Sequence, residues 1–233
     1  MSRPAIPVGT PPEPGPARLV LALALAGLIS GIIIIAIFEA TLPTITANKA
    51  AALRSAVFRV LPGVSRLQPL RIRDGRLVPA PGAKADPETI YGGYDREGRF
   101  IGYAIPAEGP GFQDTIQLLY GYLPAKRLIV GMQILDSRET PGLGDKIYKD
   151  AAFVANFDHL SPDPQVVAVK KGHKSAPNEI DAITGATISS KAVVRIINEA
   201  QARWRGRLPP SGNEPPLAQP AAGSAGNGTT PGK

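Results

Sequence analysis

Apolar residues are distributed very unevenly along this chain. Residues 19–38 read LVLALALAGLISGIIIIAIF, a run of 20 positions without a charge. Because a helix rises about 1.5 Å per residue, this run is long enough to cross the hydrocarbon core of a bilayer. A cleaved signal peptide is the alternative, since ALALAG resembles a cleavage site, but the apolar run extends well beyond the usual signal length. The pattern predicts an uncleaved transmembrane helix over 19–38.

The two ends of the chain differ from its middle in composition. Residues 1–18 and 207–233 are rich in Pro and Gly and poor in large apolar side chains, so both are predicted to be disordered. Arg18 directly precedes the apolar run and Glu39 directly follows it, although Lys49 lies close beyond. This distribution favours a cytoplasmic N-terminus and an exported main domain.

The pattern between 44 and 206 changes from helical to alternating and back. Apolar residues recur at helical spacing over 47–60 and 189–204, and the segments between them mostly alternate in the manner of strands. The turns at 95–98 and 123–126, each between two predicted strands, predict two hairpins. The sequence therefore predicts one α+β domain over 44–206. Strands are expected over 91–94, 100–105, 115–122, 128–135 and 165–169, with a short helix over 150–157.

Composition excludes several kinds of site. The chain has no cysteine, which rules out cysteine-ligated iron–sulfur clusters, cysteine-based zinc sites and disulfides. The net charge is +7, but the basic residues are scattered and not interleaved with aromatic residues. They fit solvated faces or anionic lipid headgroups better than nucleic acid, which we do not expect as a partner. The histidines His159 and His173 stand alone, so no catalytic set is predicted.

The stretch DAITGATISSK, from Asp181 to Lys191, places two hydroxyls around a Gly-Ala turn just before an apolar helix. Glycine lets the backbone approach a ligand closely, and the first N–H groups of a helix attract anions. A phosphate suits such a turn, and a threonine hydroxyl beside it can donate to it or become esterified. The plainer interpretation is helix capping, for which Ser189 or Ser190 is suited.

A second unusual stretch, ETPGLGDK, runs from Glu139 to Lys146 and follows a predicted strand. Two glycines flank Leu143, so this leucine is expected to project from a loop with free backbone N–H groups. Such a loop suits a flat, partly apolar ring, whereas an ordinary Pro-Gly turn would explain the same letters without a ligand.

Taken together, the two stretches resemble the FMN-binding domain of the G subunit of the Rnf electron-transport complex. The chain is also similar, more distantly, to the C subunit of the Na+-translocating NADH:quinone reductase. The N-terminal apolar span, the helix ending in Val60-Leu61-Pro62-Gly63 and the Gly111-Phe112 pair before a strand agree with this resemblance, which covers roughly residues 40–204.

The resemblance implies a covalently bound flavin. In the family, a flavin transferase uses FAD as donor and esterifies the FMN phosphate to the last threonine of the motif, which is Thr187 here. It further implies a site at the turn and on the loop near the flavin ring. The implied cofactor-binding residues are Thr187, Thr184, Gly185, Ala186, Asp181, Glu139, Thr140, Gly142, Leu143 and Gly144.

The same resemblance implies an electron-transfer protein without a catalytic site of its own. Its expected partners are the other membrane subunits of an Rnf-type complex, the flavin transferase and the lipid bilayer. Its expected location is the cytoplasmic membrane, with a single span and the main domain on the periplasmic side. Two alternatives stay open: an envelope module that binds phosphate or nucleotide reversibly, and an assembly protein with a vestigial flavin site.

Overall fold

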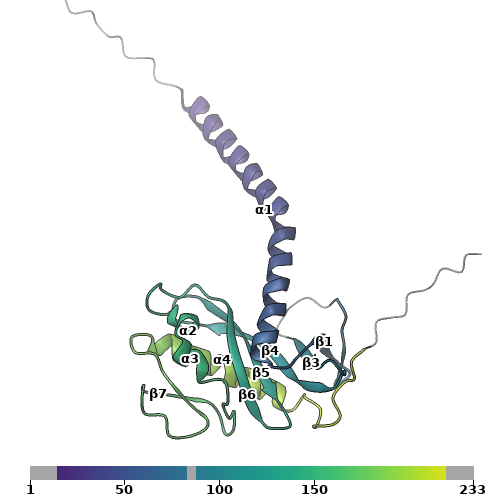
Figure 1. Cartoon of the computed structure of the whole chain (residues 1–233). Coiled ribbons are helices and arrows are strands. Elements are labelled where there is room, and N and C mark those ends of the chain that lie inside the picture. Colours follow the sequence, from purple (N-terminus) through teal and green to yellow (C-terminus); the bar gives the residue numbers. More distant parts are fainter. Residues whose placement is uncertain (1–14, 83–87, 219–233) are drawn as a thin grey trace, which may run out of the picture. The chain divides into compact units, whose positions relative to one another are not determined.

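The computed structural model describes residues 15–82 and 88–218, and the elements lie in the order shown in Figure 1. The chain divides into two units, residues 1–49 and 50–233, and α1 contributes to both. The helices are α1 Pro16–Val60, α2 Lys146–Lys149, α3 Ala151–Ala155 and α4 Thr187–Arg205. The strands are β1 Arg66–Arg73, β2 Arg76–Pro79, β3 Thr89–Tyr94, β4 Phe100–Pro110, β5 Thr115–Leu123, β6 Leu128–Asp136, β7 Val167–Val169 and β8 Glu179–Asp181.

The first unit is the N-terminal part of α1. Its large apolar side chains from Leu19 to Phe38 are exposed, each by about half or more. Within the described ranges, α1 is the one helix long and apolar enough to cross a membrane. Two helices are predicted from the sequence in this region, 19–38 and 47–60, and the structure joins them into one helix that includes Pro43.

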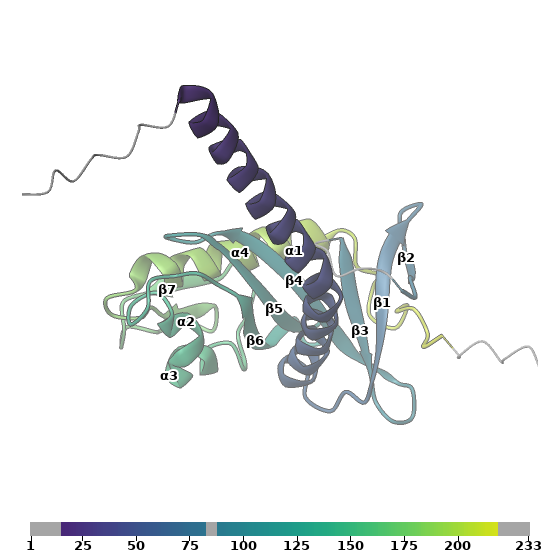
Figure 2. The ribbon, with the colours of Figure 1, turned by 90° about the horizontal axis from the view of Figure 1, so that it is seen from above.

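The second unit is built on a six-stranded antiparallel sheet with the strand order β2-β1-β3-β4-β5-β6. A separate parallel pair, β7 and β8, lies with α2 and α3 beyond the β6 edge in Figures 1 and 2. The two hairpins predicted from the sequence are confirmed as β3–β4 and β5–β6, and the α+β class is confirmed with them. Strands β1, β2 and β8 are not predicted, because their short or basic sequences do not alternate clearly.

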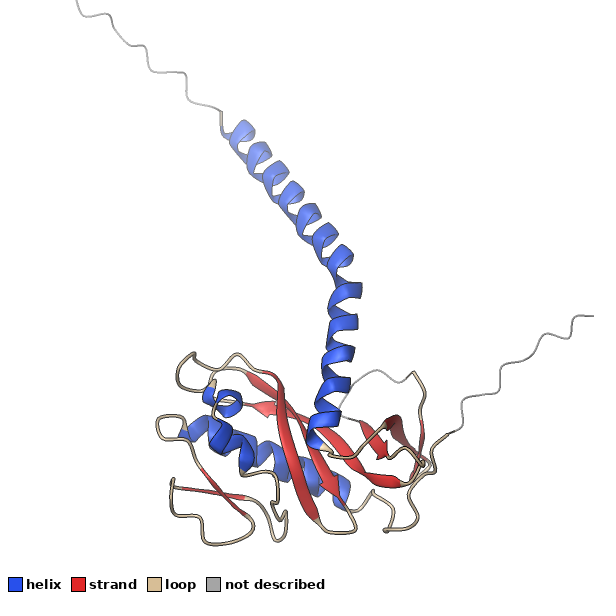
Figure 3. Cartoon of the chain, viewed as in Figure 1, coloured by secondary structure: helices blue, strands red, loops and turns tan. Residues whose placement is uncertain are grey.

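Both faces of the large sheet are covered by helix, as Figure 3 shows. The apolar face of α4, including Val193, Ile197 and Trp204, packs in one core with Ile105 and Tyr120 of the sheet. The opposite face forms a second core with the end of α1 and with the other alternating residues of the same strands. Strands β4 and β5 therefore carry apolar residues on both of their faces, which is typical of a sheet between two helical layers.

The beginning of the Pro-rich tail is held against the sheet. The side chain of Gln68 donates to the carbonyl of Pro216 at 3.1 Å and accepts from the N–H of Ala218. The hydroxyl of Tyr94 donates to the carbonyl of Pro215, which is buried. Most residues of the two segments predicted to be disordered, 1–18 and 207–233, lie outside the described residues. Residues 208–218 are described and differ from that expectation. Carbonyl and amide groups at the end of this segment pair with buried side chains of β1 and β3.

Candidate functional site

The turn that carries Thr187 connects β8 to α4. The N–H of Ala186 donates to the carbonyl of Ile183 at 3.0 Å and closes the turn. Gly185 has φ +84°, a conformation that residues with a side chain rarely adopt, so glycine is required there. The helix then begins at Thr187.

Ser190 fixes the start of this helix from inside its first turn. Its hydroxyl accepts from the N–H of Ile183 at 3.1 Å and donates to the carbonyl of Ala186 at 2.9 Å. The expectation that Ser189 or Ser190 caps the helix is wrong, because the helix begins two residues earlier and its N-cap, Ala186, has no capping side chain. Capping therefore does not explain the hydroxyl residues of this motif.

Thr187 is an exposed residue, and its hydroxyl is only weakly bound. Its one hydrogen bond in the described structure, to the carbonyl of Ile183, measures 3.5 Å, at the limit of a hydrogen bond. Thr184 and Gly185 are exposed as well. A reagent or ligand at the surface can reach the Thr187 oxygen without any rearrangement of the core.

Glu139 joins three segments that are far apart in the sequence. Its carboxylate accepts from the N–H groups of Phe112 and Gln113, each at 2.9 Å, and from the hydroxyl of Ser189 on α4. Glu139 is only 5% exposed. A Cβ on Gly144 would lie 2.7 Å from the Cβ of Glu139, so glycine is needed for the loop to close around this carboxylate.

The same contacts set the charge state of Glu139. Burial alone would raise the pKa of this carboxyl, but the hydrogen bonds from Ser189 and from the backbone of residues 112–114 outweigh it and lower the pKa. Glu139 is therefore ionised at neutral pH. Its oxygens accept these hydrogen bonds within the protein, so Glu139 holds the loop in position.

The structure brings the two sequence motifs into contact. A Cβ built on Gly185 would lie 3.9 Å from the Cδ2 atom of Leu143, so the Leu143 side chain reaches the turn before Thr187. Leu143 is 50% exposed, as expected for an apolar residue held out on a loop. Thr140 is turned elsewhere, since its hydroxyl donates to the side chain of Gln113 at 2.8 Å. Gly142 has φ +78° and shapes the loop.

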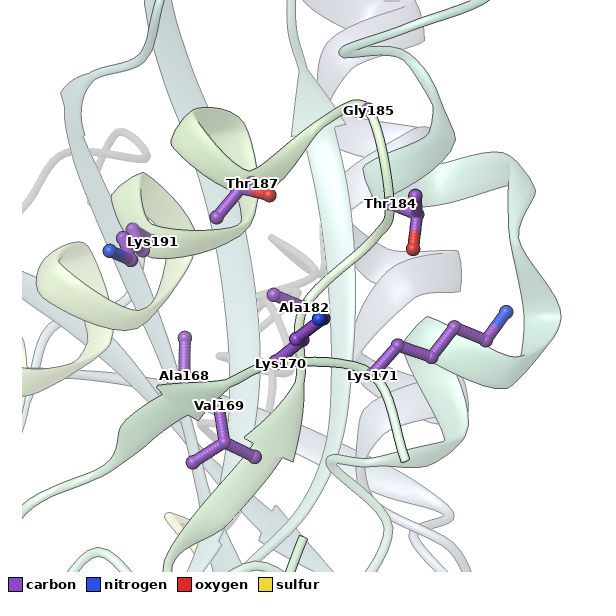
Figure 4. Close-up of a pocket in the computed structure, with 9 residues that line it drawn as sticks. All are labelled: Ala168, Val169, Lys170, Lys171, Ala182, Thr184, Gly185, Thr187 and Lys191. Atoms are coloured by element: carbon purple, nitrogen blue, oxygen red, sulfur yellow. The ribbon is translucent and has the colours of Figure 1, made fainter. Parts of the chain in front are cut away.

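A surface pocket of about 290 Å³ lies directly beside Thr187. Figure 4 shows Thr184, Gly185 and Thr187 along its rim and, in this view, Lys170 between Thr187 and Lys171. The lining residues are Ala168, Val169, Lys170, Lys171, Ala182, Thr184, Gly185, Thr187 and Lys191. Lys170 and Lys171 belong to the basic residues that are expected on solvated faces or at lipid headgroups, so their place in this pocket is not predicted. The sequence signal available for Lys191 is its position four residues after Thr187.

Asp181, the first residue of the motif, acts on the lysine-bearing turn. Its carboxylate accepts from the N–H of Gly172 at 2.8 Å, and its own N–H donates to the side chain of Asn156 at 3.1 Å. Asp181 therefore connects the turn after β7 to the threonine turn after β8. Among the described residues, no group of His, Asp and Glu side chains is placed to hold a metal ion.

Comparison with known proteins gives a consistent result. Residues 111–202 match the family model described as the FMN-binding domain. The G subunit of the proton-translocating ferredoxin:NAD(+) oxidoreductase complex of Clostridium ljungdahlii is 32% identical over 178 residues, which cover 76% of this chain and 85% of that protein. The G subunit of the Na(+)-translocating ferredoxin:NAD(+) oxidoreductase complex of Acetobacterium woodii is 34% identical over 143 residues, covering 60% of this chain and 67% of that protein.

Two solved structures are also similar to this chain, at low sequence identity. The C subunit of the Na(+)-translocating NADH-quinone reductase of Parabacteroides distasonis is 21% identical, with a TM-score of 0.49 over 61% of this chain and 77% of that chain. NqrC of Shewanella oneidensis is 19% identical, with a TM-score of 0.45 over 57% of this chain and 76% of that chain.

Proposed function

This chain belongs to the family of G subunits of the Rnf-type ion-translocating oxidoreductase complexes, and we propose that it is a membrane-anchored flavoprotein that carries FMN on Thr187 and relays electrons within such a complex. The observation that carries this proposal is the exposed residue Thr187, whose hydroxyl is weakly bound, at the rim of a basic pocket. A phosphate ester at this oxygen would lie among lysine side chains.

The residues around Thr187 fit FMN. The lysines of the pocket suit its phosphate, and the exposed side chain of Leu143 beside Gly185 suits its apolar ring. Bound FMN would supply one- and two-electron redox chemistry. The protein's residues then hold and orient the cofactor: Glu139 fixes the loop that carries Leu143, and Ser190 fixes the turn before Thr187.

Attachment would proceed by phosphoryl transfer on a flavin transferase. The Thr187 oxygen forms a bond to the phosphorus nearer the riboflavin of FAD, and the P–O bond of the diphosphate breaks. AMP leaves, and the proton of the hydroxyl is released. No electrons are exchanged in this step, so the attached flavin keeps its oxidation state.

We further propose that α1 anchors the protein in the cytoplasmic membrane as a single span over 19–38. The cytoplasmic side would hold residues 1–18, and the domain over 44–206 would lie on the periplasmic side, in agreement with Arg18 before the span and Glu39 after it. One helix cannot form a path for ions, so the partners would be other membrane proteins of the complex. Gly27 and Gly31 would allow close packing against one of them.

The test is co-expression of the full chain with a flavin transferase, followed by intact mass and in-gel fluorescence. Wild type and Thr187→Ser, which keeps the hydroxyl, are expected to gain one FMN. Thr187→Val keeps the shape of the side chain without the oxygen and is expected to gain none. A folded wild-type protein that never gains this mass would overturn the covalent proposal and favour reversible binding of a phosphate or nucleotide in the basic pocket.

A further inference from the structure

Three lysines line the pocket beside Thr187, and no acidic residue is among the residues that line it. Lys170 and Lys171 come from the turn after β7, and Lys191 comes from α4. All three are exposed, and none forms an ion pair in residues 15–82 and 88–218. Like charges gathered around one pocket repel one another, and an anion bound between them removes that repulsion.

The turn that carries the two adjacent lysines is held in place by several contacts. The N–H of His173 donates to the carbonyl of Lys170 at 2.9 Å, and Gly172 adopts φ +80°. The carboxylate of Asp181 binds the N–H of Gly172. The N–H of Ala182 donates to the carbonyl of Val169 at 2.8 Å, one residue before the pair. The lysine turn and the threonine turn are thus fixed to each other through the paired strands β7 and β8.

Lys191 approaches the same pocket from the other side. It lies four residues after Thr187 on α4, and residues with this spacing lie above one another on one face of a helix. Figure 4 shows Thr187 and Lys191 on successive turns of α4, with Lys170 on the segment across the pocket. An anion bonded to the Thr187 oxygen would lie between α4, which carries Lys191, and the turn that carries Lys170 and Lys171, and these long, flexible side chains can turn toward it.

We propose that Lys170, Lys171 and Lys191 form the binding site for the phosphodiester that links FMN to Thr187, an assignment that rests on the proposed function of this turn. Lysine is a flexible point donor, and its hydrogen bonds to phosphate oxygens are among the stronger ones. The site takes a phosphodiester monoanion, and holding the phosphate limits the motion of the flavin joined to it. Asp181 is a positioning residue in this arrangement, because it acts through the lysine turn.

The test uses the full chain in detergent after flavin attachment, with ³¹P NMR of the phosphodiester and fluorescence anisotropy of the flavin. The double variant Lys170→Gln/Lys171→Gln and the single variant Lys191→Gln are expected to shift the ³¹P resonance and to lower the anisotropy. Lys174→Gln is the matched control, since it makes the same charge change in the same connection but lies outside the pocket lining. Unchanged resonance and anisotropy in the pocket variants would overturn the assignment.

A second measurement separates this assignment from the proposed function. Thr187→Val cannot carry the flavin, so its binding of inorganic phosphate can be followed by NMR titration whether or not attachment occurs. We expect each lysine removed from this background to weaken phosphate binding about two- to fivefold, since the lysines are exposed, and Lys174→Gln to leave it unchanged. Equal phosphate binding by all variants would overturn the lysine site. It would not bear on the modification of Thr187, which the mass measurement tests separately.

Discussion

At the scale of single residues, the geometry of the site depends most on one buried carboxylate. From its own loop, Glu139 binds the loop at 112–113 and the first turn of α4 through three hydrogen bonds. Its charge is neutralised only by these donors, because no cation contacts it among the described residues. The alignment of Leu143 with Thr187 is therefore a property of hydrogen bonding, not of an ion pair.

Replacing Glu139 by Gln should destabilise the protein. The amide nitrogen of Gln would face a donor, leaving a buried group unpaired, so we expect the free energy of unfolding at pH 7 to fall by about 1–3 kcal/mol. Urea denaturation followed by tryptophan fluorescence measures this change. Glu108→Gln, at an exposed position, should stay within about 0.5 kcal/mol of wild type.

Wild type and Glu139→Gln should also differ in how their stability depends on pH. Folding lowers the pKa of Glu139, so its ionised form stabilises the fold at pH values above its pKa in the unfolded chain, about 4.3. This stabilisation disappears as the pH falls through the lower pKa of the folded protein. Wild type should therefore lose more stability than Glu139→Gln between pH 6 and pH 3. A gap of constant size over this range would show that folding does not lower the pKa of Glu139.

Two buried tyrosines differ in whether the hydroxyl has a hydrogen-bond partner in the described structure. Burial raises the pKa of Tyr94 to about 12, with a further increase from the Glu214 carboxylate, so its hydroxyl stays a donor to Pro215. The hydroxyl of Tyr120 is buried without a partner in the described structure. Tyr94→Phe should lower the free energy of unfolding by about 1 kcal/mol, and Tyr120→Phe should leave it equal or raise it by a similar amount. Denaturant titration of both variants tests this difference.

At the scale of elements, a pair of glycines lets the end of α1 approach the sheet. A Cβ on Gly121 in β5 would lie 1.9 Å from the carbonyl oxygen of Val60, and one on Gly131 in β6 would lie 2.9 Å from the Cα of Val60. The two glycines are opposite each other in the strand register. Backbone thus packs on backbone at this point, and no side chain can fit between them.

Gly121→Ala should therefore be among the most damaging small substitutions in the domain. The added methyl group must displace backbone, so we expect a loss of about 3 kcal/mol or more, or failure to fold. Gly206→Ala is the matched control, because a Cβ at this position would have nothing within 4 Å and its φ is −91°. Thermal unfolding of both variants measures this difference. An equal loss of stability in the two would contradict the close packing of α1 on Gly121.

The sequence predicts those elements whose apolar pattern repeats over enough residues. The helix α4 and the hairpins β3–β4 and β5–β6 follow from periodicity and turn residues, and the motif points to the turn around Thr187. The roles of Glu139 and of Lys170 do not follow, because each depends on a neighbour contributed by a distant segment. Glu139 contacts Ser189 across 50 residues, and no local pattern encodes that contact.

At the scale of the whole molecule, the proposed topology can be tested with the chain's own composition. The chain has no cysteine, so single variants Ser2→Cys and Lys174→Cys report only on the introduced residue. A membrane-impermeant maleimide should label Lys174→Cys in intact spheroplasts and Ser2→Cys only after lysis. Labelling in the reverse order would place the domain in the cytoplasm, and the cysteine-free wild type controls for background.

The tail segment 208–218 has a practical consequence for measuring electron transfer. It is held by Gln68 and Tyr94 on β1 and β3, whereas Thr187 belongs to the group of elements beyond β6, at the other edge of the sheet. A protein tethered to an electrode through a tag after Ala218 would thus turn its threonine turn toward the solution. Tethering through a residue near Lys174 would instead bring that turn to the metal surface, and the two orientations should give very different electron-transfer rates.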